Sequence, residues 1–303
     1  MEPNWQLARK RKTIEQRARI LHKIRAFFIE QGFIEVETPH RIPVNAPEFN
    51  IDAIPSDGWF LQTSPELCMK RLLAAGYDKI FQICHCWRAE ERGPHHLPEY
   101  TMLEWYRRDS DYQQLMSDCE ELITHLVDNQ TLTWQGREIN IATPWPRLTV
   151  AQAFLQHSST LLSQITDANF FSERISTEIE PALAQNKPLF LIDYPTLQGS
   201  LARPKTNDPD CVERVELYIA GLELANGFSE LTDPAEQRQR FELEEKHRQQ
   251  SGKIPCPLPE KYLEELETLS NAAGIALGID RLVMLLSDQP TIDEVVCFSP
   301  EQL

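Results

Sequence analysis

A long hairpin is the feature that most limits how this chain can fold. Residues 79–90 (KIFQICHCWRAE) and 99–108 (EYTMLEWYRR) both have the character of strands, and only residues 91–98 (ERGPHHLP) separate them. A loop this short joins antiparallel neighbours, because parallel strands need a crossover of about a dozen residues or more. Further strand-like stretches at 188–195 and 212–227 also lack the regular strand–helix alternation of a doubly wound fold. The sequence therefore predicts an α+β fold, with a mostly antiparallel sheet flanked by helices.

Helix signals surround these strands. Residues 13–32 place apolar side chains at helical spacing, Thr13 and Gln16 are spaced for a capping box at the start, and Gly32 ends the segment. The following FIEVET, residues 33–38, alternates like a strand. Further helices are predicted at residues 64–76, 111–127 and 234–250, and 275–286 reads as a strand running into a helix. No repeat or convincing linker divides the chain, so we expect a single domain over residues 1–303.

Composition excludes several classes of protein. No stretch approaches the roughly 18 apolar residues of a membrane span, and no apolar run follows the basic cluster Arg9–Lys12. Seven cysteines, an odd number without regular spacing, are typical of reduced thiols rather than of a disulfide framework. The formal net charge of −16 disfavours binding of nucleic acid through a broad basic surface. We expect a cytoplasmic protein that contacts no membrane.

The hairpin gathers side chains that suit either a metal or an anion. Alternation along a strand predicts that Cys84, Cys86, Arg88 and Glu90 share one face. On the returning strand, the residues that share a face are Tyr100, Met102, Glu104 and Tyr106. A zinc site needs four convergent ligands, and its cysteines are usually separated by two residues rather than one. We therefore favour strand packing for the thiols, and an amino acid with a nucleotide as the ligands of the arginine, carboxylates and phenols.

Three separated stretches resemble the signature motifs of one family. They are GFIEVETP (residues 32–39), the hairpin with WRAE and PEYTMLEWY, and GIALGIDRL (residues 274–282), in this order. Together they resemble the three motifs of the class II aminoacyl-tRNA synthetases. The stretches ELANGFSEL (residues 223–231) and SPEL (residues 64–67) resemble the lysine branch of that class. The likeness covers nearly the whole chain from the first helix onward.

The resemblance implies an ATP-dependent activation of an amino acid. In this family the substrate carboxylate attacks the α-phosphate of ATP, which gives an aminoacyl-adenylate and pyrophosphate. The catalytic residues would be Arg88 and Arg281. Arg88 would bridge the substrate carboxylate and the α-phosphate, and Arg281 would lie against adenine and reach the γ-phosphate. A planar guanidinium suits both tasks because it binds anions bidentately and stacks on rings. Glu216 and Glu223 match the two acids that hold Mg²⁺ in the family.

The same likeness assigns the substrate contacts. For ATP it implies Arg88, Ala89, Glu90, His96, Leu97, Tyr100, Glu223, Leu224, Gly278 and Arg281. For the amino acid it implies Ser64, Pro65, Glu66, Glu104, Tyr106, Asn226, Phe228, Glu230 and Ala276. Glu104, Tyr106 and Glu230 would surround the distal ammonium of the substrate, whereas Glu66 and Asn226 would receive its head group. Such a pocket rejects a substrate that lacks the amine, because the buried acids would then lie unpaired.

Two departures from lysyl-tRNA synthetases indicate a particular branch. The first motif begins at Gly32, which leaves no room for the anticodon-binding β-barrel that precedes it in those enzymes. Ala276 stands where they have glycine, and one added methyl in the head-group pocket can displace the amine of the substrate. Both features resemble short members of the family that transfer (R)-β-lysine to a lysine ε-amine of translation elongation factor P.

The expected partners follow from this likeness. They are ATP with Mg²⁺, (R)-β-lysine, elongation factor P as the protein acceptor, and a second copy of the chain that pairs through the first motif. We do not expect tRNA to be a partner. The alternatives are a minimal lysyl-tRNA synthetase, a free-standing amino-acid ligase, or a non-catalytic regulatory subunit. The acceptor amine must lose a proton before it attacks, and the sequence identifies no base for that step.

Overall fold

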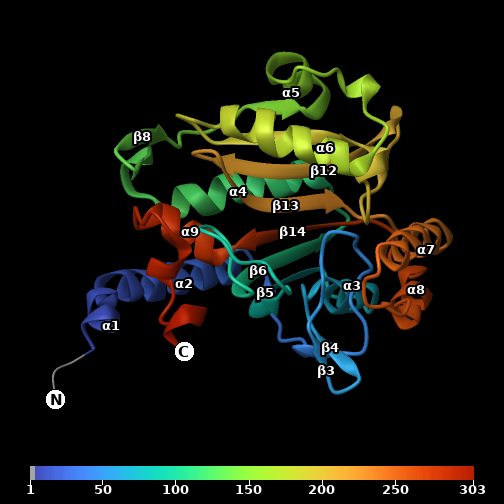
Figure 1. The fold of residues 1–303 in the computed structure, drawn as a ribbon, viewed down its shortest axis with the longest axis horizontal. Helices are drawn as coiled ribbons and strands as arrows, with labels where there is room; N and C mark the ends of the chain where they lie inside the picture. Colours follow the sequence, from blue (N-terminus) through green and yellow to red (C-terminus); the bar gives the residue numbers. More distant parts are fainter. Residues whose placement is uncertain (1–3) are drawn as a thin grey trace.

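The computed structural model describes residues 4–303, and a nine-stranded sheet runs through this part of the chain (Figure 1). Its order is β1-β5-β6-β14-β13-β12-β10-β9, and β11 pairs with β12. The strands are β1 (Ile34–Glu35), β5 (Lys79–Trp87), β6 (Glu99–Arg108), β9 (Arg147–Thr149), β10 (Leu189–Pro195), β11 (Pro204–Lys205), β12 (Asp208–Ile219), β13 (Leu222–Ser229) and β14 (Ala272–Gly278). Only β1–β5 and β9–β10 are parallel among the paired strands of residues 4–303, so the predicted α+β fold is confirmed.

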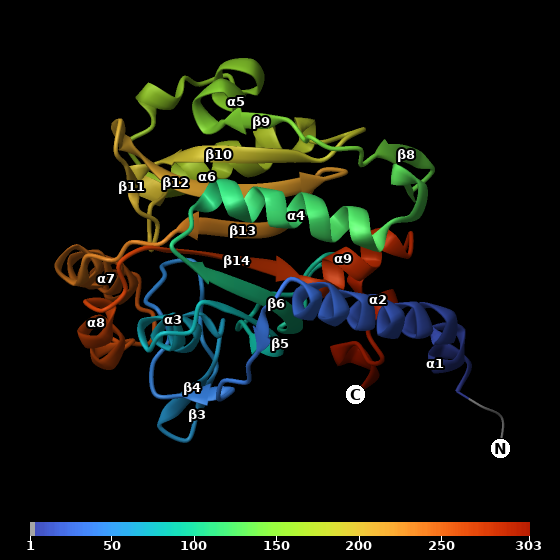
Figure 2. The same ribbon diagram turned by 180° about the vertical axis from the view of Figure 1, so that it is seen from behind.

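Helices cover the sheet unequally. They are α1 (Trp5–Arg9), α2 (Arg11–Glu30), α3 (Glu66–Ala74), α4 (Tyr112–Leu126), α5 (Val150–His157), α6 (Ala168–Arg174), α7 (Pro234–Gln250), α8 (Glu260–Leu266) and α9 (Ile279–Leu286). Figure 2 shows α2 and α4 lying across one face of the sheet. Their apolar residues form the main core with that face, where the ring of Phe28 stacks on Phe81 with centroids 4.9 Å apart. The functional side chains are carried by the opposite face, which is less covered.

Two smaller sheets complete the fold. One is made of β2 (Arg41–Ile42), β4 (Trp59–Leu61) and β3 (Pro55–Ser56), and the other of β7 (Thr131–Trp134) and β8 (Arg137–Asn140). Within residues 4–303, every helix is too short or too polar to span a membrane.

Two local predictions near the N-terminus are wrong. Thr13 and Gln16 form no capping box, because α2 already begins at Arg11, directly after α1, so that Thr13 lies inside the helix. The side chain of Gln16 instead donates a hydrogen bond to the carbonyl of Leu286 at 2.8 Å. The strand expected at 33–38 is reduced to Ile34–Glu35, since only these two residues pair with β5.

A buried ion pair joins α2 to the start of α9. Nη1 of Arg17 lies 2.6 Å from Oδ1 of Asp280, and Nη2 donates to the hydroxyl of Thr101 at 2.8 Å. The backbone N–H of Thr101 donates to the second carboxylate oxygen of Asp280 at 2.7 Å. These bonds satisfy both buried oxygens of Asp280. They therefore fix the first turn of α9, which carries Arg281.

Candidate active site

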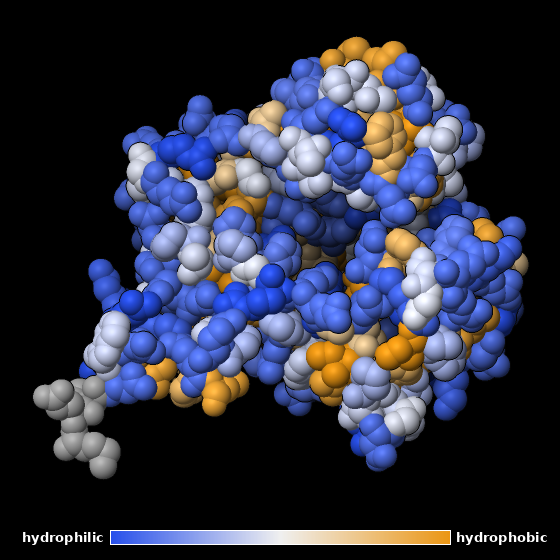
Figure 3. Space-filling model, in the orientation of Figure 1, coloured by the Kyte–Doolittle hydropathy of each residue, from blue (hydrophilic) through white to orange (hydrophobic). Residues whose placement is uncertain are grey.

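A cavity of about 840 Å³ opens on the less covered face of the sheet. In Figure 3 it is a hollow between the part of the molecule around α6 and the part around α7, with a largely hydrophilic rim. A cavity of this size can hold a nucleotide or another large ligand. Most residues predicted to bind substrates line it: Ser64, Glu66, Arg88, His96, Leu97, Tyr100, Glu104, Tyr106, Glu216, Glu223, Leu224, Asn226, Phe228, Ala276, Gly278 and Arg281.

Cross-strand registration explains why distant residues meet on the cavity floor. Glu216 of β12 pairs with Asn226 of β13, Asn226 pairs with Ala276 of β14, and Ala276 pairs with Glu104 of β6. Directly opposed residues of antiparallel strands point to the same face. The four side chains therefore form one row across four strands, and the alternation seen in the sequence places this row toward the cavity.

A second row lies two residues along each strand. It contains Arg214, Phe228, Gly274 and Tyr106, again in direct register. A Cβ on Gly274 would lie 2.1 Å from Cε1 of Tyr106 and 2.8 Å from Oε1 of Glu230. A side chain cannot fit there without displacing the phenol. Gly274 therefore lets Tyr106 pack flat on β14 and hold its hydroxyl toward the acids of the pocket.

Glu104 is a buried carboxylate with two hydroxyl partners. Ser64 donates to Oε1 at 2.6 Å and Tyr106 donates to Oε2 at 2.8 Å. Burial, together with the negative charge of Glu66, raises the pKa of Glu104 to about 7. The hydroxyl of Ser64 also accepts from the backbone N–H of Glu66, the first residue of α3, at 3.0 Å. The site can therefore accept a cation at Glu104, since no positive side chain pairs with it in the described chain.

A neighbouring pair of acids already has its cation. Lys70 of α3 is fully buried, and its Nζ lies 2.5 Å from Oε1 of Glu66 and forms an ion pair with Oε2 of Glu230. The same Nζ lies 4.9 Å from the centre of the Phe228 ring. Burial raises the pKa of Glu230 to about 8, although Lys70 opposes this effect. Glu230 does not line the cavity; it lies behind the wall and is paired with a lysine of the protein itself.

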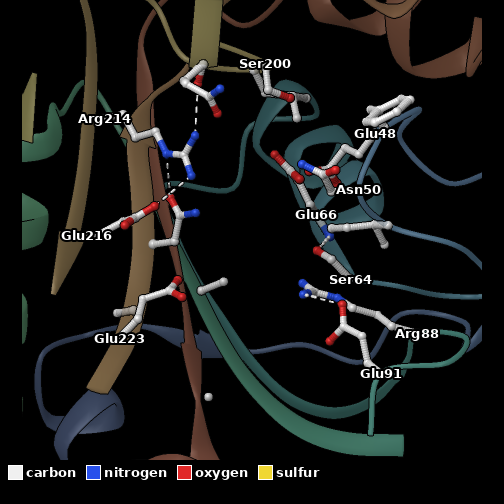
Figure 4. Close-up of a pocket in the computed structure, with 18 of the residues that line it drawn as sticks. Glu48, Asn50, Ser64, Glu66, Arg88, Glu91, Ser200, Arg214, Glu216 and Glu223 are labelled. Carbon is white, nitrogen blue, oxygen red and sulfur yellow. Dashed lines mark hydrogen bonds and ion pairs between the residues drawn. The ribbon is translucent and has the colours of Figure 1, made fainter. Parts of the chain in front are cut away.

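Arg88 and Arg281 both line the cavity. The Arg88 guanidinium lies over the ring of Tyr100, with Cζ 5.3 Å from the ring centre, and 3.6 Å from the carboxylate of Glu91. Nη1 of Arg281 donates to the carbonyl of Glu223 at 2.7 Å, and its Nη2 contacts the ring of His96. Figure 4 shows Arg88 and Glu91 on the opposite side of the pocket from Glu216 and Glu223. The cationic groups thus border a common space in which an anionic ligand can lie.

The hairpin tip corrects one prediction. Glu90 does not continue the alternation of the strand, because β5 ends at Trp87 and Glu90 adopts a positive φ of 63° in the turn. Its side chain is exposed, and Glu91 lines the cavity instead. Ala89 and Pro65 also lie outside the cavity lining. The two cysteines Cys84 and Cys86 pack in a small cluster with Met102, as expected for strand-packing thiols.

The residues predicted to hold a metal ion are only partly available to it. Glu216 accepts hydrogen bonds from the hydroxyls of Tyr194 and Tyr218, and its Oε1 lies 2.7 Å from Nη2 of Arg214. Residues 4–303 contain no group of three or more His, Cys, Asp or Glu side chains that could hold a metal alone. Mg²⁺ commonly uses one or two carboxylates and takes its other ligands from water and substrate phosphates. Glu216 and Glu223 fit that chemistry, in which the phosphates complete the site.

Several cavity residues were missed in the sequence. Arg214 lies two positions before Glu216, so the alternation of β12 was a signal for it. Its guanidinium also donates to Oδ1 of Asn226 at 3.2 Å. Glu48 lies in an irregular stretch, and residues 166–169 cover the entry to the short helix α6, so neither had a periodic pattern that could signal it. The residues missed by sequence reasoning include Glu48, Glu91, His95, Thr166, Asp167, Ala168, Asn169, Arg214, Glu244 and His247.

Comparison with known proteins agrees with this geometry. The sequence profile of the family described as tRNA synthetases class II (D, K and N) matches residues 5–302. The chain belongs to this class II synthetase family. Its membership implies an ATP-dependent ligase. Of the three signature segments, the hairpin and residues 274–282 line the cavity, whereas residues 32–39 lie outside its lining.

Curated relatives within the class II family share nearly the whole length of the chain. The elongation factor P–(R)-β-lysine ligase of Vibrio atlanticus (strain LGP32) is 37% identical over 318 residues, which cover 98% of each chain. The protein of the same name from Edwardsiella ictaluri (strain 93-146) is 35% identical over 319 residues, covering 99% of this chain and 98% of its own. That from Salmonella typhi is 35% identical over 331 residues, covering 98% of each.

Proposed function

We propose that this protein activates (R)-β-lysine with ATP and transfers the β-lysyl group to a lysine ε-amine of translation elongation factor P. The curated relatives bear the name of that activity and match the chain from end to end. The observation that carries the proposal is the row Asn226–Ala276–Glu104, which joins an acid-lined pocket to a space bordered by two arginines. An amino acid bound along this row would meet a nucleotide at its carboxylate end.

The activation step needs charge neutralisation rather than a base. A carboxylate with an ordinary pKa near 4 is ionised at neutral pH, so the barrier is the repulsion between it and the phosphates of ATP. Arg88 would bridge the two anions, and Arg281 would neutralise the departing pyrophosphate. Mg²⁺ held by Glu216 and Glu223 with phosphate oxygens would supply further positive charge. Tyr100 would face adenine, and His96, whose pKa is lowered by burial and by Arg281, would remain a neutral neighbour of the terminal phosphates.

The amino-acid pocket would select a substrate with two amines. Glu104, with Tyr106 and Ser64, would take the distal ammonium, because it is a buried carboxylate without a cation of its own. Glu66 and Asn226 would receive the head group. Glu230 would not contact the substrate; it would act indirectly, by forming the ion pair that positions Lys70. The methyl group of Ala276 lies between Asn226 and Glu104 in the row, where it would favour an amine displaced by one carbon.

We also propose that two copies pair through β1. This strand lies at the edge of the sheet, and Ile34 on it is 54% exposed although it is a large apolar residue. An exposed sheet edge with apolar side chains is suited to pairing with another chain. The described residues would act as a single catalytic domain, and tRNA would not be a substrate.

Pyrophosphate exchange tests the activation step. The purified protein is incubated with ATP, labelled pyrophosphate and one candidate amino acid at a time: α-lysine, each β-lysine enantiomer or ornithine. We expect the fastest exchange with (R)-β-lysine. Preference for α-lysine together with charging of tRNA would favour a minimal lysyl-tRNA synthetase. Absence of exchange with all four would favour a non-catalytic role.

A further inference from the structure

The loop between β2 and β3 is held firmly at the edge of the cavity. Nη1 of Arg248, on α7, donates to the carbonyls of Glu48 and Ile51 at 2.8 and 2.7 Å. The backbone N–H of Phe49 donates to Oε2 of Glu244 at 3.0 Å, and Nζ of Lys253 donates to the carbonyl of Phe49 at 2.7 Å. Four hydrogen bonds from three residues in or just after α7 therefore fix the backbone on which Glu48 stands.

The side chain of Glu48 has no partner of its own. It lines the cavity, and no hydrogen bond or ion pair from residues 4–303 reaches its carboxylate. Figure 4 shows it on the same side of the pocket as Glu66 and across from Arg214. Four charged groups act on it electrostatically: Glu66 of α3, Arg88 after β5, Arg214 of β12 and Glu244 of α7. Burial, reinforced by Glu66, raises its pKa to about 7 despite the two arginines.

Every other carboxylate that lines the cavity is already engaged. Within the described chain, the partners are as follows: Glu66 with Lys70, Glu91 with Arg88, Glu104 with two hydroxyls, Asp167 with the N–H of Phe170, Glu216 with Arg214, Glu223 with Arg281, Glu244 with the N–H of Phe49, and Asp280 with Arg17. Ion pairs and hydrogen bonds to the charged form make an acid a weaker base. Glu104, whose pKa is still raised to about 7, is the acid proposed to hold the distal ammonium of the substrate. Glu48 is thus the carboxylate that remains available to accept a proton from a ligand.

We propose that Glu48 is the general base of the transfer step, taking a proton from the ε-ammonium of the acceptor lysine. The inference rests on the proposed function, whose second half-reaction has no other assigned base. The acceptor arrives as R–NH₃⁺ and gives one proton to the carboxylate of Glu48. The free amine then attacks the carbonyl carbon of the adenylate, a C–N bond forms, and the C–O bond to AMP breaks with its electron pair leaving on AMP. The second proton leaves the nitrogen to solvent as the amide forms.

The position of Glu48 suits that task and no part of the activation step. It lines the same cavity as Arg88, which the proposed function assigns to the reacting carboxylate and whose charge acts on it. It reaches the cavity from the loop and not from the floor that would bind the amino acid. A base is most effective when its pKa lies near the working pH, since it is then deprotonated and still able to take a proton. Removal of such a base typically costs about 10²–10⁴-fold in rate.

Separate assays of the two half-reactions test the proposal. Glu48→Gln should leave pyrophosphate exchange with (R)-β-lysine within about twofold of the wild type, because the side chain makes no structural bond. Transfer to elongation factor P from preformed adenylate, measured in a single turnover, should fall by at least about 100-fold. The pH profile of the wild-type transfer rate should show an inflection near pH 7, where Glu48 loses its proton, and Glu48→Gln should lack this inflection. Glu242→Gln removes the same charge from an exposed position of α7 and should behave as the wild type.

The outcomes distinguish this proposal from the function on which it rests. An unchanged transfer rate, or an unchanged pH profile, in Glu48→Gln would overturn the assignment of the base. A parallel loss of exchange would overturn it as well, because Glu48 would then be a ligand of the amino acid. If the wild type exchanged pyrophosphate with no lysine isomer, the proposed function itself would fall, whatever the variant did. Partial recovery of transfer by Glu48→Asp would support a role for the carboxylate itself.

Discussion

Replacing Glu104 by glutamine should stabilise the ligand-free protein at alkaline pH while it removes amino-acid activation. The carboxylate is 1% exposed, and its two neighbours in the pocket are hydroxyl groups. Without substrate it lies buried with no cation beside it, so its charge is costly. A protonated glutamate and a glutamine have nearly the same shape and both retain an oxygen acceptor. The substitution therefore changes mainly the charge.

The magnitude follows from the shift in pKa. Burial raises the pKa of Glu104 from its ordinary value of 4.5 to about 7. Between these two values the folded protein holds a proton that the unfolded chain has lost, so stability falls as pH rises through this window. A shift of about 2.5 units at about 1.4 kcal/mol per unit corresponds to roughly 3 kcal/mol. This cost is absent near pH 4 and is complete above about pH 8.

Urea unfolding at several pH values measures this effect. The difference in unfolding free energy between Glu104→Gln and the wild type should be small at pH 5 and should grow to about 2–3 kcal/mol in favour of the variant at pH 8.5. Glu48 and Glu230 also have raised pKa values, but they are present in both proteins and largely cancel in the difference. A difference that stays constant with pH, or a variant that is less stable at pH 8.5, would refute the reasoning.

Three further substitutions test the pocket. Ala276→Gly should shift relative kcat/KM toward α-lysine by about 5-fold, the value of one methyl group at about 1 kcal/mol; an unchanged preference in the exchange assay would remove this residue from the account. Gly274→Ala should raise the KM for the amino acid by a much larger factor than the KM for ATP, because a Cβ there would lie 2.1 Å from the ring of Tyr106. An unchanged KM for the amino acid would contradict this prediction. Lys70→Met should lower the free energy of unfolding by about 3–5 kcal/mol, since it leaves two acids without their cation. Adding Glu230→Gln should restore much of this loss. A double variant no more stable than Lys70→Met would refute this coupling.

The sheet and its rows could be predicted because period-2 alternation is a strong local signal. The hairpin of β5 and β6 follows from its sequence, and the side chains of Tyr100 and Glu104 face the cavity as alternation requires. The same rule failed at Glu90, because β5 ends at Trp87 and Glu90 lies in a turn, where it adopts a positive φ. Alternation thus locates a site residue only as far as the strand continues.

Other features depend on contacts that no local pattern encodes. The pairing of Lys70 with Glu66 could be expected from their spacing of four residues on one helix. The second partner of Lys70, Glu230, lies between β13 and α7, and no local pattern in the sequence indicates that pairing. Glu48 owes its position to Arg248, two hundred residues away along the chain. The family resemblance supplied roles for residues whose chemistry alone left them undecided, and it supplied none for Glu48.

The most direct test of the account is the mass of purified elongation factor P after incubation with the protein, ATP, Mg²⁺ and (R)-β-lysine. We expect one β-lysyl increment on a single lysine, no increment when ATP is omitted, and none with Arg88→Ala, which removes the cation proposed to join the reacting anions. An unmodified factor in the presence of active wild-type enzyme and measurable pyrophosphate exchange would contradict the transfer to a protein lysine.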